Sequence, residues 1–77
     1  MTLPRDEIVA LVHDAALAIS AVPSAGVVLN GRLECPAYVA VRETLKRRGM
    51  EGLPPRMMED LEDAAYALWV LLKDAAP

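Results

Sequence analysis

Apolar side chains recur every three or four positions in three parts of the chain, which predicts three helices. The first is expected from Thr2 to about Val22, with Thr2 as N-cap and Pro4 in the first turn. One face of this helix carries an apolar stripe: Ile8, Leu11, Val12, Ala15, Ile19 and Val22. Five alanines keep the helix thin, so that a neighbouring helix can approach closely: Ala10, Ala15, Ala16, Ala18 and Ala21.

A β-hairpin is expected next, because Asn30-Gly31 separates two short runs of strand-forming residues. The two-residue turn sets a register with three pairs: Val27 with Glu34, Val28 with Leu33, and Leu29 with Arg32. We expect the face that carries Val28 and Leu33 to be buried. Since a lone hairpin is marginally stable in water, it should pack on the helices or pair with a hairpin of a second chain.

The second helix is expected to begin at Cys35-Pro36, because proline is tolerated in a first turn, and to run to about Arg48 before Gly49. Its apolar stripe is short: Ala37, Tyr38, Val41 and Leu45. The third helix is expected from Pro55 to about Ala75, with a longer stripe: Met57, Leu61, Ala64, Leu68, Leu71, Leu72 and Ala75. The fold class is therefore mainly α, with three helices and a hairpin between the first and the second.

Length and composition limit the class of protein. The chain has 77 residues, of which 55% are apolar, and this length allows one domain, residues 1–77. Such an apolar content excludes a disordered tail, and a single cysteine excludes a disulfide scaffold within the chain. The longest apolar run, residues 64–72, is far shorter than the roughly 20 residues that span a membrane. No secretion signal is recognisable, so we expect a cytoplasmic protein.

The apolar run in the third helix is the strongest functional signal. Tyr66, Trp69 and Val70 lie off the main stripe of that helix and predict a protein interface. Glu59 and Asp63 would steer this surface toward a basic partner, with salt slowing association. We expect the partner to be a second copy, forming a homodimer, or another protein with a basic or apolar surface. The alternative is that the first helix covers the run within the chain.

A basic patch near the end of the second helix supports a different hypothesis. Arg42, Lys46, Arg47 and Arg56, with Arg48 among them, could contact phosphates in a DNA-binding regulator. Cations are, however, also favoured in the last turn of a helix by the helix dipole. The acidic isoelectric point, near 4.9, makes nucleic acid the less favoured partner.

No pattern of residues in the chain predicts a catalytic or metal site. His13 and Asp14 are adjacent, so their side chains diverge on a helix and do not form a relay, and no known signature surrounds Cys35. Acidic residues crowd the start of the third helix, where the dipole favours them: Glu59, Asp60, Glu62 and Asp63. Without a histidine or a second acidic helix beside them, they predict no metal site. We therefore expect no catalytic residue, metal or cofactor.

Together these patterns predict a non-enzymatic protein-binding module that forms a homodimer and acts as a small inhibitor, adaptor or antitoxin-like regulator. Arginine outnumbers lysine six to two and alanine is abundant, which favours a bacterial or bacteriophage source. In length and acidic charge the chain is similar to small phage-encoded inhibitors, anti-CRISPR proteins among them. That analogy is one of size and charge alone.

Overall fold

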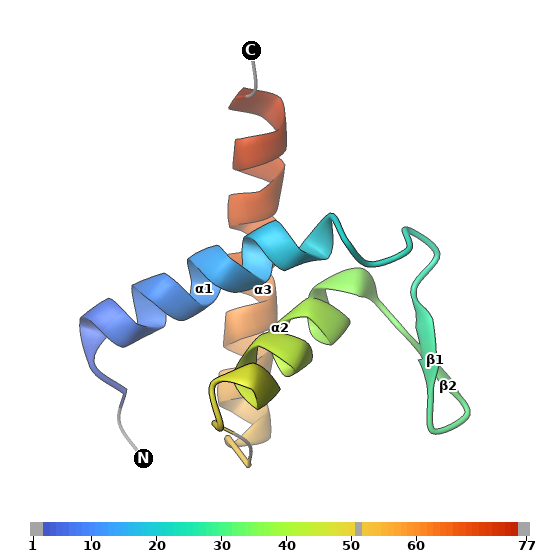
Figure 1. Cartoon of the computed structure of the whole chain (residues 1–77), viewed down its shortest axis with the longest axis horizontal. Helices are drawn as coiled ribbons and strands as arrows, with labels where there is room; N and C mark the ends of the chain where they lie inside the picture. Colours follow the sequence, from blue (N-terminus) through green and yellow to red (C-terminus); the bar gives the residue numbers. More distant parts are fainter. Residues whose placement is uncertain (1–2, 51, 76–77) are drawn as a thin grey trace.

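The computed structural model describes residues 3–50 and 52–75, and over these residues the chain forms three helices and one two-stranded hairpin (Figure 1). The elements follow in the order α1 (Arg5–Ile19), β1 (Val27–Leu29), β2 (Arg32–Glu34), α2 (Pro36–Arg47) and α3 (Pro55–Ala75). The predicted fold class is confirmed. None of the described helices combines the length and apolar character that a membrane crossing requires.

The first helix is shorter than predicted at both ends. It begins at Arg5, and Pro4 is its N-cap in an extended conformation, so Pro4 precedes the first turn and offers no side-chain cap. Thr2, the expected N-cap, lies outside the described residues. At the other end Ser20 is the C-cap, and the chain continues to Val22 as turns. The following Pro23 disfavours helical geometry in the residue before it, which explains the early end.

The hairpin has the predicted register, with Val28 opposite Leu33. Its turn residues Asn30 and Gly31 have φ values of 51° and 78°, as a type I′ turn requires. The prediction that the face of Val28 and Leu33 is buried was wrong, because these side chains are 66% and 67% exposed. Both faces carry two apolar side chains, so the pattern did not decide between them. The side of the hairpin that carries Val27, together with Leu29 and Glu34, is the half-buried one.

The hairpin does not join the helical core. Figure 1 shows it beside the start of α2, away from the place where α1 crosses α3. The core consists of residues from all three helices: Leu11, Ala15, Ile19, Ala37, Ala40, Val41, Leu45, Leu61 and Ala65. Four of these nine are alanine, which lets the helices approach closely. Of the five alanines predicted to keep the first helix thin, Ala15 and Ala16 are buried, whereas Ala10 and Ala21 are exposed. The predicted stripe of α2 is buried except for Tyr38, which is half-buried.

The third helix has the predicted extent but is covered over only part of its length. Leu61 and Ala65 are its fully buried residues. Ala64 and two later members of the predicted stripe, Leu71 and Leu72, are exposed, because α1 crosses α3 instead of running along it (Figure 1). The C-terminal half of α3 therefore projects from the body. Accordingly, the radius of gyration is 12.2 Å, somewhat above the roughly 11.5 Å expected for a compact chain of this length.

Candidate functional site

A groove lies at the base of the projecting half of α3, where this helix meets the end of α1 and the start of α2. It encloses about 680 Å³, within the range of typical ligand pockets. Its lining comes from three helices and from the turn after α1: Ile19, Ser20, Val22, Ser24, Cys35, Pro36, Ala37, Glu62, Asp63, Tyr66 and Trp69. We call it the α3 groove.

Local chain geometry builds each wall of the α3 groove. On one side, α1 ends at Ile19 and the turn through Val22 carries the chain away from α3. On the other side, Pro36 starts α2 directly after the extended Cys35. The third wall belongs to α3, where side chains three, four and seven positions apart share one face: Glu62, Asp63, Tyr66 and Trp69.

The aromatic wall is fixed in place by contacts on several sides. The Trp69 Nε1–H donates to Ser20 Oγ at 3.0 Å and so ties α3 to the C-cap of α1. The Tyr66 ring packs against the indole with 5.8 Å between centroids and a 40° tilt. The Lys73 ammonium lies 4.9 Å from the centroid of the Trp69 ring, within the range of a cation–π contact.

The acidic wall is electrostatically unbalanced. The Cys35 Sγ lies 3.8 Å from Glu62 Oε1, which makes the thiol a weak donor to this carboxylate. Burial raises the pKa of Glu62, and the neighbouring negative charges of Asp63, Glu59 and Glu34 raise it further. Within residues 3–50 and 52–75, neither Glu62 nor Asp63 forms an ion pair. The carboxylates of this wall are therefore negative charges without an ion-pair partner among the described residues, while the Lys73 ammonium lies against the aromatic wall.

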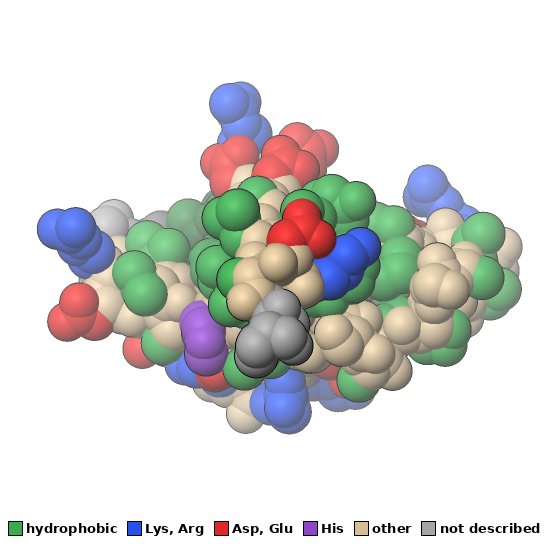
Figure 2. All heavy atoms as spheres, turned by 90° about the horizontal axis from the view of Figure 1, so that it is seen from above, with side chains coloured by type: hydrophobic (Ala, Val, Ile, Leu, Met, Phe, Trp, Pro, Cys, Tyr) green, Lys and Arg blue, Asp and Glu red, His purple; other side chains and the backbone are tan. Residues whose placement is uncertain are grey.

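A second hollow, of about 800 Å³, lies on another side of α1. Its apolar lining comes from α1 and from the beginning of the projecting half of α3: Ile8, Val9, Ala10, Val12 and Leu68. Leu71 and Leu72 follow Leu68 by three and four positions and are 66% and 38% exposed. Figure 2 shows hydrophobic side chains gathered around the end of α3 and over the neighbouring α1. We call the surface of Ile8, Val9, Leu68, Leu71 and Leu72 the α1–α3 corner.

The structure brings together three of the five predicted interface residues. Asp63, Tyr66 and Trp69 line the α3 groove. Glu59 and Val70 belong to the same face of α3 by their spacing but do not line the groove. Tyr66 is 54% exposed while Trp69 and Val70 are half-buried, so α1 does not fully cover this run.

Sequence reasoning missed two features of this region. The hollow shape of the groove depends on how the three helices meet, and no sequence pattern reports that. Glu62 was recognised only as part of an acidic cluster. It lies four positions before Tyr66 and seven before Trp69, so helical spacing could have placed it on the aromatic face.

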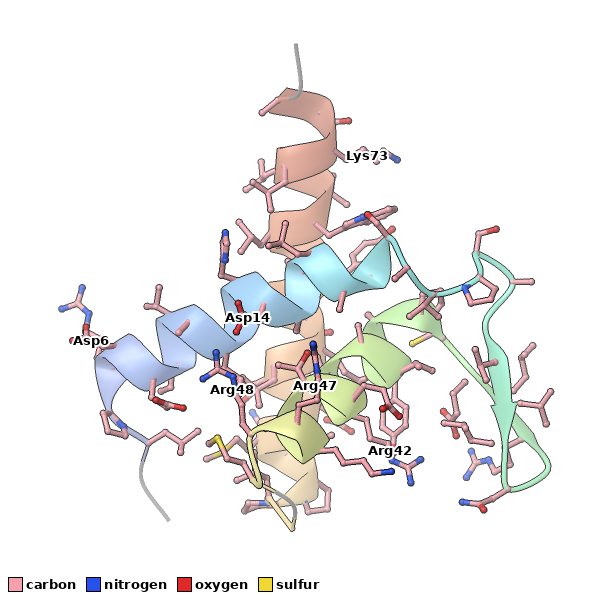
Figure 3. The ribbon with its side chains drawn as sticks, viewed as in Figure 1. Asp6, Asp14, Arg42, Arg47, Arg48 and Lys73 are labelled. Carbon is pink, nitrogen blue, oxygen red and sulfur yellow. The ribbon has the colours of Figure 1, made fainter. Side chains whose placement is uncertain are left out.

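The predicted basic patch is divided. Arg42 and Lys46 share one side of α2 beside a hollow of about 350 Å³, whereas Figure 3 shows Arg47 on a different side of that helix. The Arg47 guanidinium donates to Thr44 Oγ1 at 3.3 Å, and Arg56 Nε lies 3.9 Å from Asp60 Oδ1. The four residues therefore do not form one continuous cationic surface.

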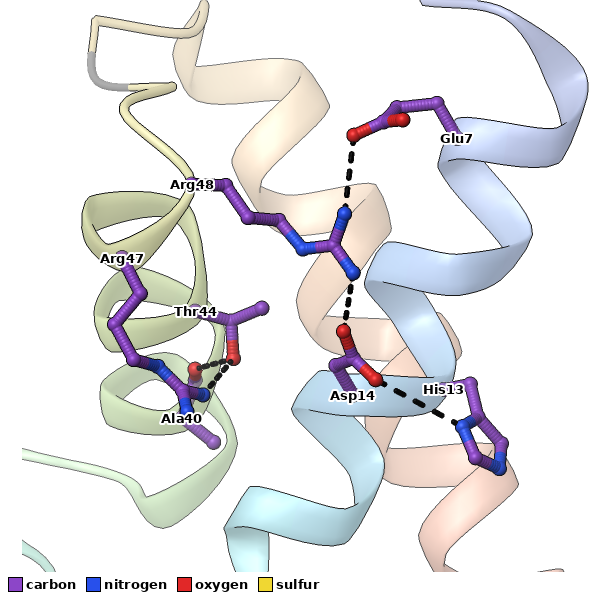
Figure 4. A network of polar contacts seen from close by, with 7 residues as sticks. All are labelled: Glu7, His13, Asp14, Ala40, Thr44, Arg47 and Arg48. Carbon is purple, nitrogen blue, oxygen red and sulfur yellow. Dashed lines mark hydrogen bonds and ion pairs between the residues drawn. The ribbon is translucent and has the colours of Figure 1, made fainter.

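Arg48 joins two helices. Its guanidinium donates to Glu7 Oε1 at 3.1 Å and to Asp14 Oδ2, so the end of α2 is tied to α1 (Figure 4). The hydrogen bond from Arg48 holds the pKa of Asp14 below its ordinary value. This pairing between the second and first helices was not predicted from the sequence.

The candidate chemical residues are not brought together. His13 Nδ1 lies 3.9 Å from Asp14 Oδ1, which is too long for a hydrogen bond. His13 lines the second hollow, whereas Cys35 lines the α3 groove. In the part of the chain that the structure describes, no three acidic, histidine or cysteine side chains gather as a metal site would require.

Searches of known protein families, of curated proteins and of solved structures found no match to this chain.

Proposed function

We propose that this chain is a protein-binding module that forms a homodimer through the α1–α3 corner. The observation that carries the proposal is the projecting half of α3, which extends past α1 with Leu71 66% exposed beside an apolar hollow of about 800 Å³. A contiguous group of exposed apolar side chains beside a hollow is typical of an interaction site.

The shape of the corner favours a second copy as its occupant. A projecting ridge, formed by Leu71 and Leu72, adjoins a hollow lined by Ile8, Val9 and Leu68. In a two-fold dimer, the ridge of each copy can enter the hollow of the other, so that one surface serves both partners. A stable interface buries about 800 Å² per partner, about 15% of the 5347 Å² surface of this chain.

One of the two acidic groups at the rim of the hollow is balanced within the chain, whereas Asp6 forms no ion pair among the described residues. The polar residues at this rim are Asp6, His13 and Asp14. Asp14 is paired with Arg48 of the same chain, so its negative charge is balanced before a second copy approaches. The apolar side chains of the corner can then meet with limited electrostatic cost, although the chain carries a net charge of −3.

A dimer of this kind fits the role of a small inhibitor, adaptor or antitoxin-like regulator. Such a protein acts by occupying a surface of its partner, and the aromatic and acidic side chains of the α3 groove are suited to that task. In this proposal the corner joins the two copies, and the groove stays open to another protein.

The experiment that tests the dimer is light scattering coupled to size-exclusion chromatography at about 10–300 μM. The wild-type chain should have twice the 8.3 kDa mass of the monomer, and Leu71→Asp should return the mass to that of one chain. Leu17→Asp is the matched control, because Leu17 is an exposed leucine of α1 that does not line the hollow. A monomeric wild type, or a dimer unaffected by Leu71→Asp, would overturn the proposal.

A further inference from the structure

The α3 groove combines three surfaces that suit one kind of side chain. Its apolar floor includes Ile19, Val22 and Ala37. One wall is aromatic, with Tyr66 and Trp69, and beside it stands an acidic wall of Glu62 and Asp63. A long side chain with an aliphatic stem and a cationic head would find a partner for each of its parts here.

Among residues 3–50 and 52–75, no cation pairs with the acidic wall. The Cys35 thiol, 3.8 Å from Glu62 Oε1, is a weak hydrogen-bond donor. Asp63 and Glu59, one turn or less away on α3, and Glu34, at the end of β2, add further negative charge around this carboxylate. A cation placed beside Glu62 would relieve this repulsion and gain a charge-assisted hydrogen bond.

The aromatic wall already holds a cation from the same chain. The Lys73 ammonium lies 4.9 Å from the centroid of the Trp69 ring, and Figure 3 shows Lys73 on the side of α3 that faces the hairpin. The hydrogen bond from Trp69 Nε1 to Ser20 Oγ holds the indole in one orientation. The ring is therefore preorganised, and a second cation would lose little free energy in ordering it, although that cation must displace the Lys73 ammonium or overcome its repulsion.

From this arrangement we infer that the α3 groove binds an arginine side chain presented by a partner protein. The guanidinium can stack on the Trp69 and Tyr66 rings while its N–H groups bond to the Glu62 carboxylate, and the stem lies on the apolar floor. Arginine fits better than lysine, because its planar head both stacks on aromatic rings and binds carboxylates through two hydrogen bonds. A partner segment is favoured over the free amino acid, since the 680 Å³ groove also has apolar surface for a neighbouring residue.

This inference rests on the proposed function, because it names the chemistry of a partner for the binding module. The groove and the α1–α3 corner involve different residues of α3, so the two ideas can be tested separately. Light scattering reports the dimer, whereas the single tryptophan of the chain, Trp69, reports the groove.

The probe is a pair of blocked peptides, acetyl-Gly-Leu-Arg-Leu-Gly-amide and the same peptide with citrulline, which is neutral, in place of arginine. Each is titrated into the wild-type protein to 5 mM, with Trp69 fluorescence and the indole N–H resonance as readouts. We expect the arginine peptide to shift both signals and to bind at least about tenfold more tightly than the citrulline peptide, because only arginine offers a charged donor.

Two variants test which carboxylate binds the arginine of the peptide. Glu62→Gln removes the negative charge but keeps the shape of the side chain. It should lower the affinity for the arginine peptide about tenfold. Asp60→Asn is the matched control, since Asp60 is an exposed acid of the same helix that does not line the groove, and it should leave the affinity unchanged.

Several results would overturn the inference. They are the absence of any Trp69 response up to 5 mM, equal affinity for the two peptides, and equal losses in Glu62→Gln and Asp60→Asn. Free arginine amide binding as tightly as the peptide would show a small-molecule site in place of a partner segment. Conversion of the wild-type dimer to a monomer by Glu62→Gln would assign the groove to a second copy. A monomeric wild type that still binds the arginine peptide would instead overturn only the proposed dimer.

Discussion

Gly26 shows how one residue sets the position of the hairpin. Its φ of +90° is one that residues with a side chain rarely adopt, and a Cβ at this position would overlap the carbonyl oxygen of Glu34. Its own N–H donates to Pro23 O at 2.8 Å and closes the turn after α1. Gly26 therefore allows the chain to enter β1 directly beside the end of β2.

The substitution Gly26→Ala should destabilise the protein more than Gly49→Ala. Gly49 also has a positive φ, of +70°, but nothing lies within 4 Å of where its Cβ would be. The left-handed conformation alone costs alanine about 1–2 kcal/mol, and the overlap at Gly26 should add about 1–3 kcal/mol. Urea unfolding monitored by circular dichroism measures both losses. Equal losses would show that the hairpin shifts to accommodate the new side chain.

At the scale of elements, an ion pair at the surface adds to the apolar packing between α1 and α2. Arg48 reaches from the C-cap of α2 to Glu7 and Asp14 of α1. The hydrogen bond from Arg48 lowers the pKa of Asp14 from its ordinary 3.8. The charged form of this carboxylate is therefore more stable in the folded state than in the unfolded chain. This contribution to stability is present above about pH 3.8 and is lost as the pH falls through the lower folded-state value.

Asp14→Asn should therefore make the free energy of unfolding depend less on pH at acidic pH. We expect the variant to be less stable than the wild type at pH 7, with the difference shrinking toward pH 3 and below. Urea midpoints at pH 7, 5 and 3 measure this change. Asp6→Asn, an acid of the same helix outside the ion pairs of the described residues, should retain most of the wild-type dependence on pH. A constant difference between wild type and Asp14→Asn would contradict this interpretation.

The elements differ in how far their sequences predict them. Local signals predicted the bounds of α2 and α3 and the hairpin register, because proline, glycine and the Asn30-Gly31 turn act on their immediate neighbours. The angle at which α1 crosses α3 depends on long-range packing of small side chains, which the periodicity of apolar residues does not encode. The exposure of Leu71 and the hollow of the α3 groove follow from that packing, and they were not predicted. The outward face of Val28 was not predicted either, because both faces of the hairpin carry two apolar side chains.

At the scale of the whole molecule, part of the 55% apolar content of the chain lies on the surface. Eight large apolar side chains among the described residues are exposed, and they fall into separate groups on the hairpin, on α1 and on α3. Four of them belong to the α1–α3 corner, and Ile8 and Val9 line its hollow. A small core rich in alanine leaves this surface uncovered, so association with a second copy should contribute to the stability of the fold.

The melting temperature should consequently depend on protein concentration. Because a dimer stabilises the folded state by mass action, raising the concentration from 5 to 500 μM should raise the Tm of the wild type by several degrees. Leu71→Asp should melt at one temperature across this range, while Leu17→Asp should behave like the wild type. Differential scanning calorimetry measures all three. A wild-type Tm that does not change with concentration would count against the dimer.

The two faces of α3 have a consequence for how tightly a partner is held. Tyr66, in the groove, and Leu68, in the corner, are two positions apart and so point about 200° apart around the helix. A dimer joined at its corners would therefore display two open grooves at once. A partner with two suitably spaced arginine segments would be held at both points, and the second contact would form at a high effective concentration. Weak binding in each groove would then suffice for strong, bivalent capture.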